Sequence, residues 1–166
     1  MSLEFIDKYG GRRIVKSVAM RRSAADLYQV WRDLSAWPQF MHNVARISEE
    51  GAKSYWDVHV GSDTVRWVVE LTADVPGRVI AWRTLVGTGA PQSGEILLQR
   101  TPNPRVTEVR VTLEYDAPKE PATWTQYHAG ETSPARQLDE ALERLRAQVE
   151  SAVRASNRAV TRGAFL

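Results

Sequence analysis

Apolar and polar residues alternate along the middle of the chain, from Val65 to Tyr115, in segments broken by turn-forming residues. Alternation with a period of two places every second side chain on the same face of a strand. Turn residues such as Pro76 and Gly77 separate the segments at hairpin spacing. The pattern therefore predicts an antiparallel sheet with one apolar face and one polar face.

The predicted hairpins can be aligned so that apolar side chains stay on one face through every turn. This alignment pairs Val58 with Trp67, Val69 with Trp82, Ile80 with Leu98, Ile96 with Val111, and Leu98 with Val109. The inward-facing set is then Trp56, Val58, Val60, Trp67, Val69, Leu71, Ile80, Trp82, Thr84, Ile96, Leu98, Val109, Val111, Leu113 and Tyr115. The other face receives mainly charged residues, as expected of a surface exposed to solvent.

Shorter elements are predicted before this sheet. The segment Arg13–Ala19 alternates and predicts a first strand, and Ser23 is a candidate N-cap for a helix directly after it. Residues 34–41 predict a second short helix, with Ser35 as its candidate N-cap. Another strand is predicted over residues 44–51.

A long amphipathic helix is predicted near the end of the chain, starting at about Pro134. Its apolar residues recur at spacings of three and four, which places them on one helical face. They are Leu138, Ala141, Leu142, Leu145, Val149 and Val153. The helix has roughly six turns, long enough to lie across a seven-stranded sheet.

Composition and charge narrow the class of protein. The 166 residues suffice for one domain, which we expect to span 1–166 with a core of about 12–155. The absence of cysteine excludes disulfides and thiolate chemistry. A net charge of +2 does not favour nucleic acid as a partner. The sequence shows neither an apolar signal segment nor a run long enough to span a membrane, so we expect a soluble, cytoplasmic protein.

Four segments resemble one superfamily of ligand-binding proteins. They are SAADLYQVWRDLSAWPQFM at 23–41, DTVRWVVELTADVPGRVIAWRT at 63–84, SGEILLQR at 93–100 and TEVRVTLEYDAP at 107–118. In this order they resemble the START-like, or Bet v 1-like (SRPBCC), superfamily, in its polyketide cyclase/dehydrase or coenzyme Q-binding branch. The resemblance covers about residues 12–155.

The resemblance implies an α+β helix-grip fold: a seven-stranded antiparallel sheet wrapped around the long C-terminal helix, with two short helices between strands 1 and 2. It also implies an internal cavity that binds a hydrophobic small molecule such as a lipid, a quinone or a polyketide-like compound. The expected ligand-binding residues are Phe40, Trp56, Val58, Trp67, Val69, Trp82, Ile96, Leu98, Val111, Tyr115, Leu138 and Leu142.

An enzyme resembling polyketide cyclases/dehydrases is an alternative, in which a few polar residues of the cavity move protons. The candidate catalytic residues are Tyr115, His42 and Arg66, with Asn43, Tyr127 and His128 as further polar candidates. The alternation along the strand that contains Arg66 predicts that its side chain lies on the outer face of the sheet. A lone histidine without a carboxylate or nucleophile partner gives little support to acid–base catalysis.

A second alternative is a structural or interaction protein whose core is packed shut. We expect no cofactor, and the three histidines lack the spacing of metal ligands. A homodimer could form through an exposed first strand and the basic end of the last helix. The chain departs from the family pattern at Pro118, Lys119 and Glu120, where relatives have a Pro-Gly-Gly-like turn, and in the inserted ATWTQYHAG before the helix.

Overall fold

The computed structural model describes residues 2–6, 12–60, 62–86, 92–115 and 134–163. Within these residues, eight strands form one antiparallel sheet in the order β1-β2-β8-β7-β6-β5-β4-β3. The strands are β1 (Ser2–Ile6), β2 (Arg12–Met20), β3 (Val44–Glu50), β4 (Lys53–Val60), β5 (Asp63–Val75), β6 (Val79–Val86), β7 (Gln92–Arg100) and β8 (Thr107–Tyr115). The helices are α1 (Ala24–Arg32), the 3₁₀-helix η1 (Leu34–Gln39) and α3 (Pro134–Gly163).

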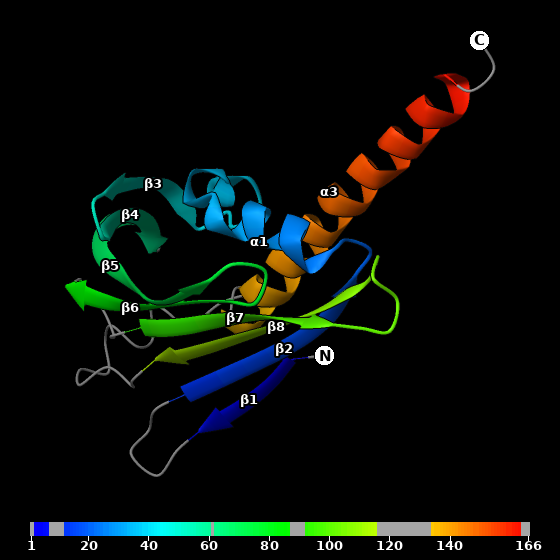
Figure 1. The fold of residues 1–166 in the computed structure, drawn as a ribbon. Coiled ribbons are helices and arrows are strands. Elements are labelled where there is room, and N and C mark those ends of the chain that lie inside the picture. The colour runs from blue at the N-terminus through cyan, green and yellow to red at the C-terminus, as the bar shows by residue number, and fades with distance from the viewer. Residues whose placement is uncertain (1, 7–11, 61, 87–91, 116–133, 164–166) are drawn as a thin grey trace.

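The curved sheet and α3 form the two layers of the molecule. Figure 1 shows α3 crossing one face of the sheet and extending beyond it at its C-terminal end, with α1 and η1 on the same face. The predicted helix-grip fold is confirmed, and β2 to β8 are the seven predicted strands. An eighth strand that the sequence did not predict, β1, pairs with β2. The predicted first strand, β2, lies between β1 and β8. It is therefore not the exposed strand through which the homodimer was expected to form.

The two predicted short helices are α1 and η1, which meet at Asp33 without an intervening loop. Ser23 caps α1 as predicted, since its hydroxyl accepts a hydrogen bond from the Asp26 amide at 3.2 Å. The predicted N-cap role of Ser35 is wrong. Asp33 ends α1 and begins η1, so Ser35 already lies inside η1, and its hydroxyl donates to the Asp33 carboxylate.

The predicted inward residues are buried or half-buried wherever the structure describes their side chains, which excludes Val60 and Tyr115. The register is correct in only one of the four hairpins. Ile96 pairs with Val111 as predicted. In the other hairpins the partners are shifted by two residues, so that Trp67 faces Trp56 instead of Val58. A shift of two residues keeps every side chain on its face, which explains why the burial pattern survived the error.

The core lies between the sheet and the helices. Its largest side chains with less than 2% exposure include Trp37 and Phe40. The predicted apolar face of α3 is buried at Leu138, Ala141, Leu142, Leu145 and Val149, while the side chain of Val153 lies outside the described residues. Among these helices, α3 packs mainly against β2 and η1 packs against β3, while the Trp37 ring of η1 reaches Trp56 on β4 and Trp82 on β6.

Candidate functional site

A cavity of about 70 Å³ lies between the sheet, η1 and the first turns of α3. Its lining comes from five strands of the sheet (β3, β4, β5, β6 and β8), from η1 and the residues after it, and from α3. The lining residues are Trp37, Met41, Asn43, Val44, Trp56, Val58, Trp67, Trp82, Leu113, Gln137 and Leu138. Four of them are tryptophans, so indole rings form much of the wall.

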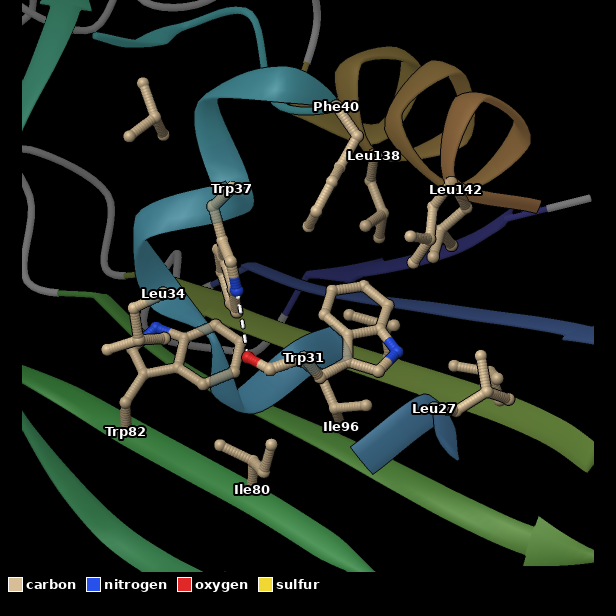
Figure 2. Close-up of a cluster of buried hydrophobic side chains, with 14 of the residues drawn as sticks. Leu27, Trp31, Leu34, Trp37, Phe40, Ile80, Trp82, Ile96, Leu138 and Leu142 are labelled. Atoms are coloured by element: carbon tan, nitrogen blue, oxygen red, sulfur yellow. Dashed lines mark hydrogen bonds between the residues drawn. The ribbon is translucent and has the colours of Figure 1, made fainter. Parts of the chain in front are cut away.

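Trp37 lies at the centre of the aromatic cluster. Its ring meets Trp56 and Trp82 edge to face, with centroids 5.0 Å and 5.6 Å away. Figure 2 shows Trp37 projecting from η1 toward Trp82, with its indole nitrogen directed at the Trp31 carbonyl. The Trp37 Nε1–H donates to that carbonyl at 2.9 Å, which fixes the plane of the ring. Edge-to-face contacts of this kind are the favoured geometry for aromatic pairs.

The polar groups in the lining are uncharged. Asn43 and Gln137 are both half-buried and bring amide groups to the cavity. The indole N–H of Trp56 is already engaged, because it donates to the Ser54 hydroxyl at 2.9 Å. Among the described lining residues, no side chain is acidic or basic, so the wall offers hydrogen bonds without a net charge.

Two polar contacts hold the helices over the cavity. Arg144 of α3 donates from Nε to the Phe40 carbonyl at the end of η1, at 3.0 Å. Lys16 of β2 points inward and forms an ion pair with Asp139 of α3 at 2.5 Å. The hydrogen bond to Asp139 raises the pKa of Lys16 above its ordinary value of 10.5, against the opposing effect of burial. Asp139 directly follows Leu138, so this ion pair positions a residue of the cavity wall.

The predicted ligand-binding residues divide into two groups. Those that line the cavity are Trp56, Val58, Trp67, Trp82 and Leu138. Those that are buried in the core but do not line it are Phe40, Val69, Ile96, Leu98, Val111 and Leu142. The side chain of Tyr115 lies outside the described residues, although its backbone ends β8.

Sequence reasoning missed several lining residues. Trp37, Met41, Val44 and Gln137 were not expected in the site, whereas Leu113 belonged to the inward set and Asn43 was considered only as a polar candidate. A signal for two of them was present, because Leu34, Trp37 and Met41 recur at spacings of three and four and so share a face of the predicted second helix.

Of the candidate catalytic residues, His42 and Arg66 do not line the cavity, and the side chain of Tyr115 lies outside the described residues. His42 is exposed. Arg66 lies on the outer face of the sheet, where its guanidinium donates to both carboxylate oxygens of Asp57 at 2.7 and 3.0 Å. Arg66 thereby lowers the pKa of Asp57, as an opposite charge does to a carboxyl group. Tyr127, His128 and the family departures at Pro118–Glu120 and in ATWTQYHAG lie outside the described residues.

The part of the chain that the structure describes holds neither a cluster of metal ligands nor a membrane-spanning helix. No group of three or more histidine, aspartate or glutamate residues there has the geometry to hold a metal ion. None of the described helices combines the length and the apolar character needed to cross a bilayer.

The chain is similar to proteins of known family and fold. Residues 20–151 match the family described as polyketide cyclase / dehydrase and lipid transport. A crystal structure from Deinococcus radiodurans is 34% identical, covers 84% of this chain and 98% of its own, and superposes with a TM-score of 0.67. A START superfamily protein from Mycobacterium smegmatis (18% identity; 82% of this chain and 98% of that one; TM-score 0.64) shares the fold. An aromatase/cyclase from Streptomyces (23% identity; 90% and 91%; TM-score 0.57) shares it too.

Proposed function

Because the chain belongs to the polyketide cyclase/dehydrase and lipid transport family, we propose that it binds a hydrophobic small molecule in the cavity under η1 and α3. The observation that carries this proposal is the lining itself, in which four tryptophans and several aliphatic side chains surround two amides. Such a wall, mostly apolar with a few polar groups that fix orientation, is typical of small-molecule sites.

The uncharged lining indicates the kind of ligand. A carboxylate taken from water into an apolar site needs a cationic partner, and the described lining contains none. The amides of Asn43 and Gln137 suit a carbonyl or hydroxyl group instead, since each amide both donates and accepts hydrogen bonds. We therefore propose a neutral ligand, such as a quinone, an alcohol or a ketone, over a free fatty acid.

The proposal is limited to binding. A reaction by proton transfer needs an acid or base within hydrogen-bond reach of the ligand. His42 is exposed and Arg66 pairs with Asp57 on the outer face of the sheet, so these two candidates do not support a catalytic role. No specific observation favours the enzyme alternative over binding.

A pair of matched probes tests the proposal. Calorimetry at pH 7 would compare 1-naphthol, which is neutral, with 1-naphthoate, which has the same ring system and a charge. We expect 1-naphthol to bind at least about tenfold more tightly, a difference of about 1.4 kcal/mol. Equal affinities would contradict the neutral-ligand proposal, and no binding of either probe would favour the closed-core alternative.

A pair of matched variants tests the location. Asn43→Asp places a carboxylate in the cavity wall, which a bound probe would have to desolvate, so we expect about a tenfold loss of 1-naphthol affinity. Asn103→Asp makes the same chemical change in the exposed turn between β7 and β8, and it should leave the affinity unchanged. Equal effects of the two variants would place the probe outside the cavity.

A further inference from the structure

The cavity is smaller than the ligands that the proposed function requires. An engineered cavity that binds benzene has a volume of about 150 Å³, and ordinary ligand pockets have about 300–1,000 Å³. The described cavity has about 70 Å³, less than half the volume of that benzene-binding cavity. A ligand with an aromatic ring therefore needs more space than the described residues leave in this arrangement.

The four tryptophans of the wall differ in how firmly they are held. Trp56, Trp67 and Trp82 lie on β4, β5 and β6, which are hydrogen-bonded to their neighbours along the sheet. Trp37 alone among them comes from η1, a six-residue 3₁₀-helix with Pro38 inside it. Hydrogen bonds in 3₁₀-helices have poorer geometry, and a proline removes one of the donors.

Two side-chain hydrogen bonds connect η1 to the other helices among the described residues, and η1 also packs against β3. One runs from the Trp37 indole to the Trp31 carbonyl of α1, and the other from Arg144 of α3 to the Phe40 carbonyl. The ring of Trp37 also packs against the rings of Trp31, Trp56, Trp82 and Phe40. An aromatic ligand in the same place can make ring contacts of the same kind.

We propose that Trp37 is an internal plug that occupies the binding site in the free protein and is displaced, together with η1, when the ligand enters. The proposal rests on the proposed function, since it concerns how the same cavity is filled. The bound state is then a minor conformation of the free protein, and the observed dissociation constant is the intrinsic one divided by the fraction of open molecules.

The variant Trp37→Leu tests the plug directly. Removal of the indole leaves the site open, so the affinity for 1-naphthol should rise at least about tenfold. The dependence of the observed association rate on probe concentration should also change. In the wild type the rate should level off at high probe concentration, because opening limits binding, whereas in Trp37→Leu it should stay proportional to concentration.

Trp31→Leu is the matched control. Trp31 belongs to the same aromatic cluster and is 3% exposed, against 1% for Trp37, but it does not line the cavity. This variant should lose stability without any gain in affinity. An equal gain in both variants would overturn the plug, because it would reflect general loosening of the core.

Hydrogen exchange in the wild type gives a second measurement that does not depend on a variant. The Met41 amide donates to the Trp37 carbonyl at 2.8 Å, so its exchange rate reports opening at the end of η1. Addition of 1-naphthol should speed this exchange, and slower exchange would overturn the proposal. If 1-naphthol binds the wild type and Trp37→Leu equally, only the plug fails; if it binds neither, the proposed function fails with it.

Discussion

The indole of Trp82 on β6 lies across Gly94 on β7, at the position where the two residues pair. A Cβ atom built on Gly94 would come within 2.3 Å of Cζ2 of Trp82 and within 2.6 Å of Cε2. Only a residue without a side chain leaves room for the ring in this place. Gly94 therefore allows Trp82 to lie low against the sheet, where it forms part of the cavity wall.

Gly94→Ala should force Trp82 away from the sheet and into the aromatic cluster. Overpacking of this kind costs about 1–3 kcal/mol, which urea denaturation can measure as a lower midpoint. A double-mutant cycle provides the control, because Gly94→Ala should cost much less in a Trp82→Leu background, where the ring is gone. The same cost in both backgrounds would show that Gly94 acts through its backbone and not through Trp82.

The same substitution at two neighbouring tryptophans should have different costs. Trp37→Phe removes a buried hydrogen bond and leaves the Trp31 carbonyl without that donor, whereas the Trp31 indole N–H has no hydrogen-bond partner among the described residues. Trp37→Phe should therefore be more destabilising than Trp31→Phe by about 1–2 kcal/mol. The free energies of unfolding in urea decide this, and a larger cost at Trp31 would contradict it.

The Lys16–Asp139 ion pair should matter most when only one partner is removed. Lys16 has a side chain only 9% exposed, so Asp139→Asn leaves a buried ammonium without its carboxylate and should cost about 1.5–3 kcal/mol. Lys16→Met replaces the charge with an apolar chain of similar length and should cost less. The opposite order in chemical denaturation would show that the carboxylate adds no net stability.

The raised pKa of Lys16 also fixes the direction of a pH effect. The unfolded lysine loses its proton near its ordinary pKa of 10.5, whereas the folded one holds it to higher pH. The ion pair thus stabilises the protein fully below pH 10.5, and this contribution disappears as the pH rises through the folded pKa. The stability difference between wild type and Lys16→Met should shrink over that range, and a constant difference would contradict the assignment.

Two serines give a direct test of helix capping. Ser23→Ala removes the hydroxyl that accepts the Asp26 amide and should cost about 1 kcal/mol. Ser35→Ala removes a hydroxyl that only contacts the exposed Asp33 side chain, and its cost should stay within about 0.5 kcal/mol. Thermal unfolding of both variants makes the comparison, which fails if Ser35 proves the costlier loss.

Much of the fold could be predicted because side-chain parity is robust. An error of two residues in a hairpin leaves the same residues inward, so Trp56, Trp67 and Trp82 were placed on the correct face although their partners were not. The register itself depends on turn length and on bulges. Val60 pairs with Asp63 across a two-residue turn, and the pairing shifts between Leu71 and Ala73, neither of which the alternation of apolar residues reveals.

The site was predicted less completely than the fold. Strand parity separates inward from outward residues, but it cannot tell which inward residues touch the cavity and which are covered by the helices. Ile96 and Leu98 are inward and lie beneath other side chains, whereas Trp37 enters the site from a helix whose position over the sheet is set by tertiary packing. The role of Gly94 was also invisible, because it depends on the rotamer of Trp82.

The most direct test of a ligand in the interior is a titration of ¹⁵N-labelled protein with 1-naphthol, followed through the indole N–H signals. If the account is correct, the signals of Trp37, Trp56, Trp67 and Trp82 shift together and saturate with the dissociation constant measured by calorimetry. The amides around Arg66 on the outer face should stay in place. Saturation with the four indole signals unmoved, or with shifts confined to the outer face, would contradict binding in this cavity.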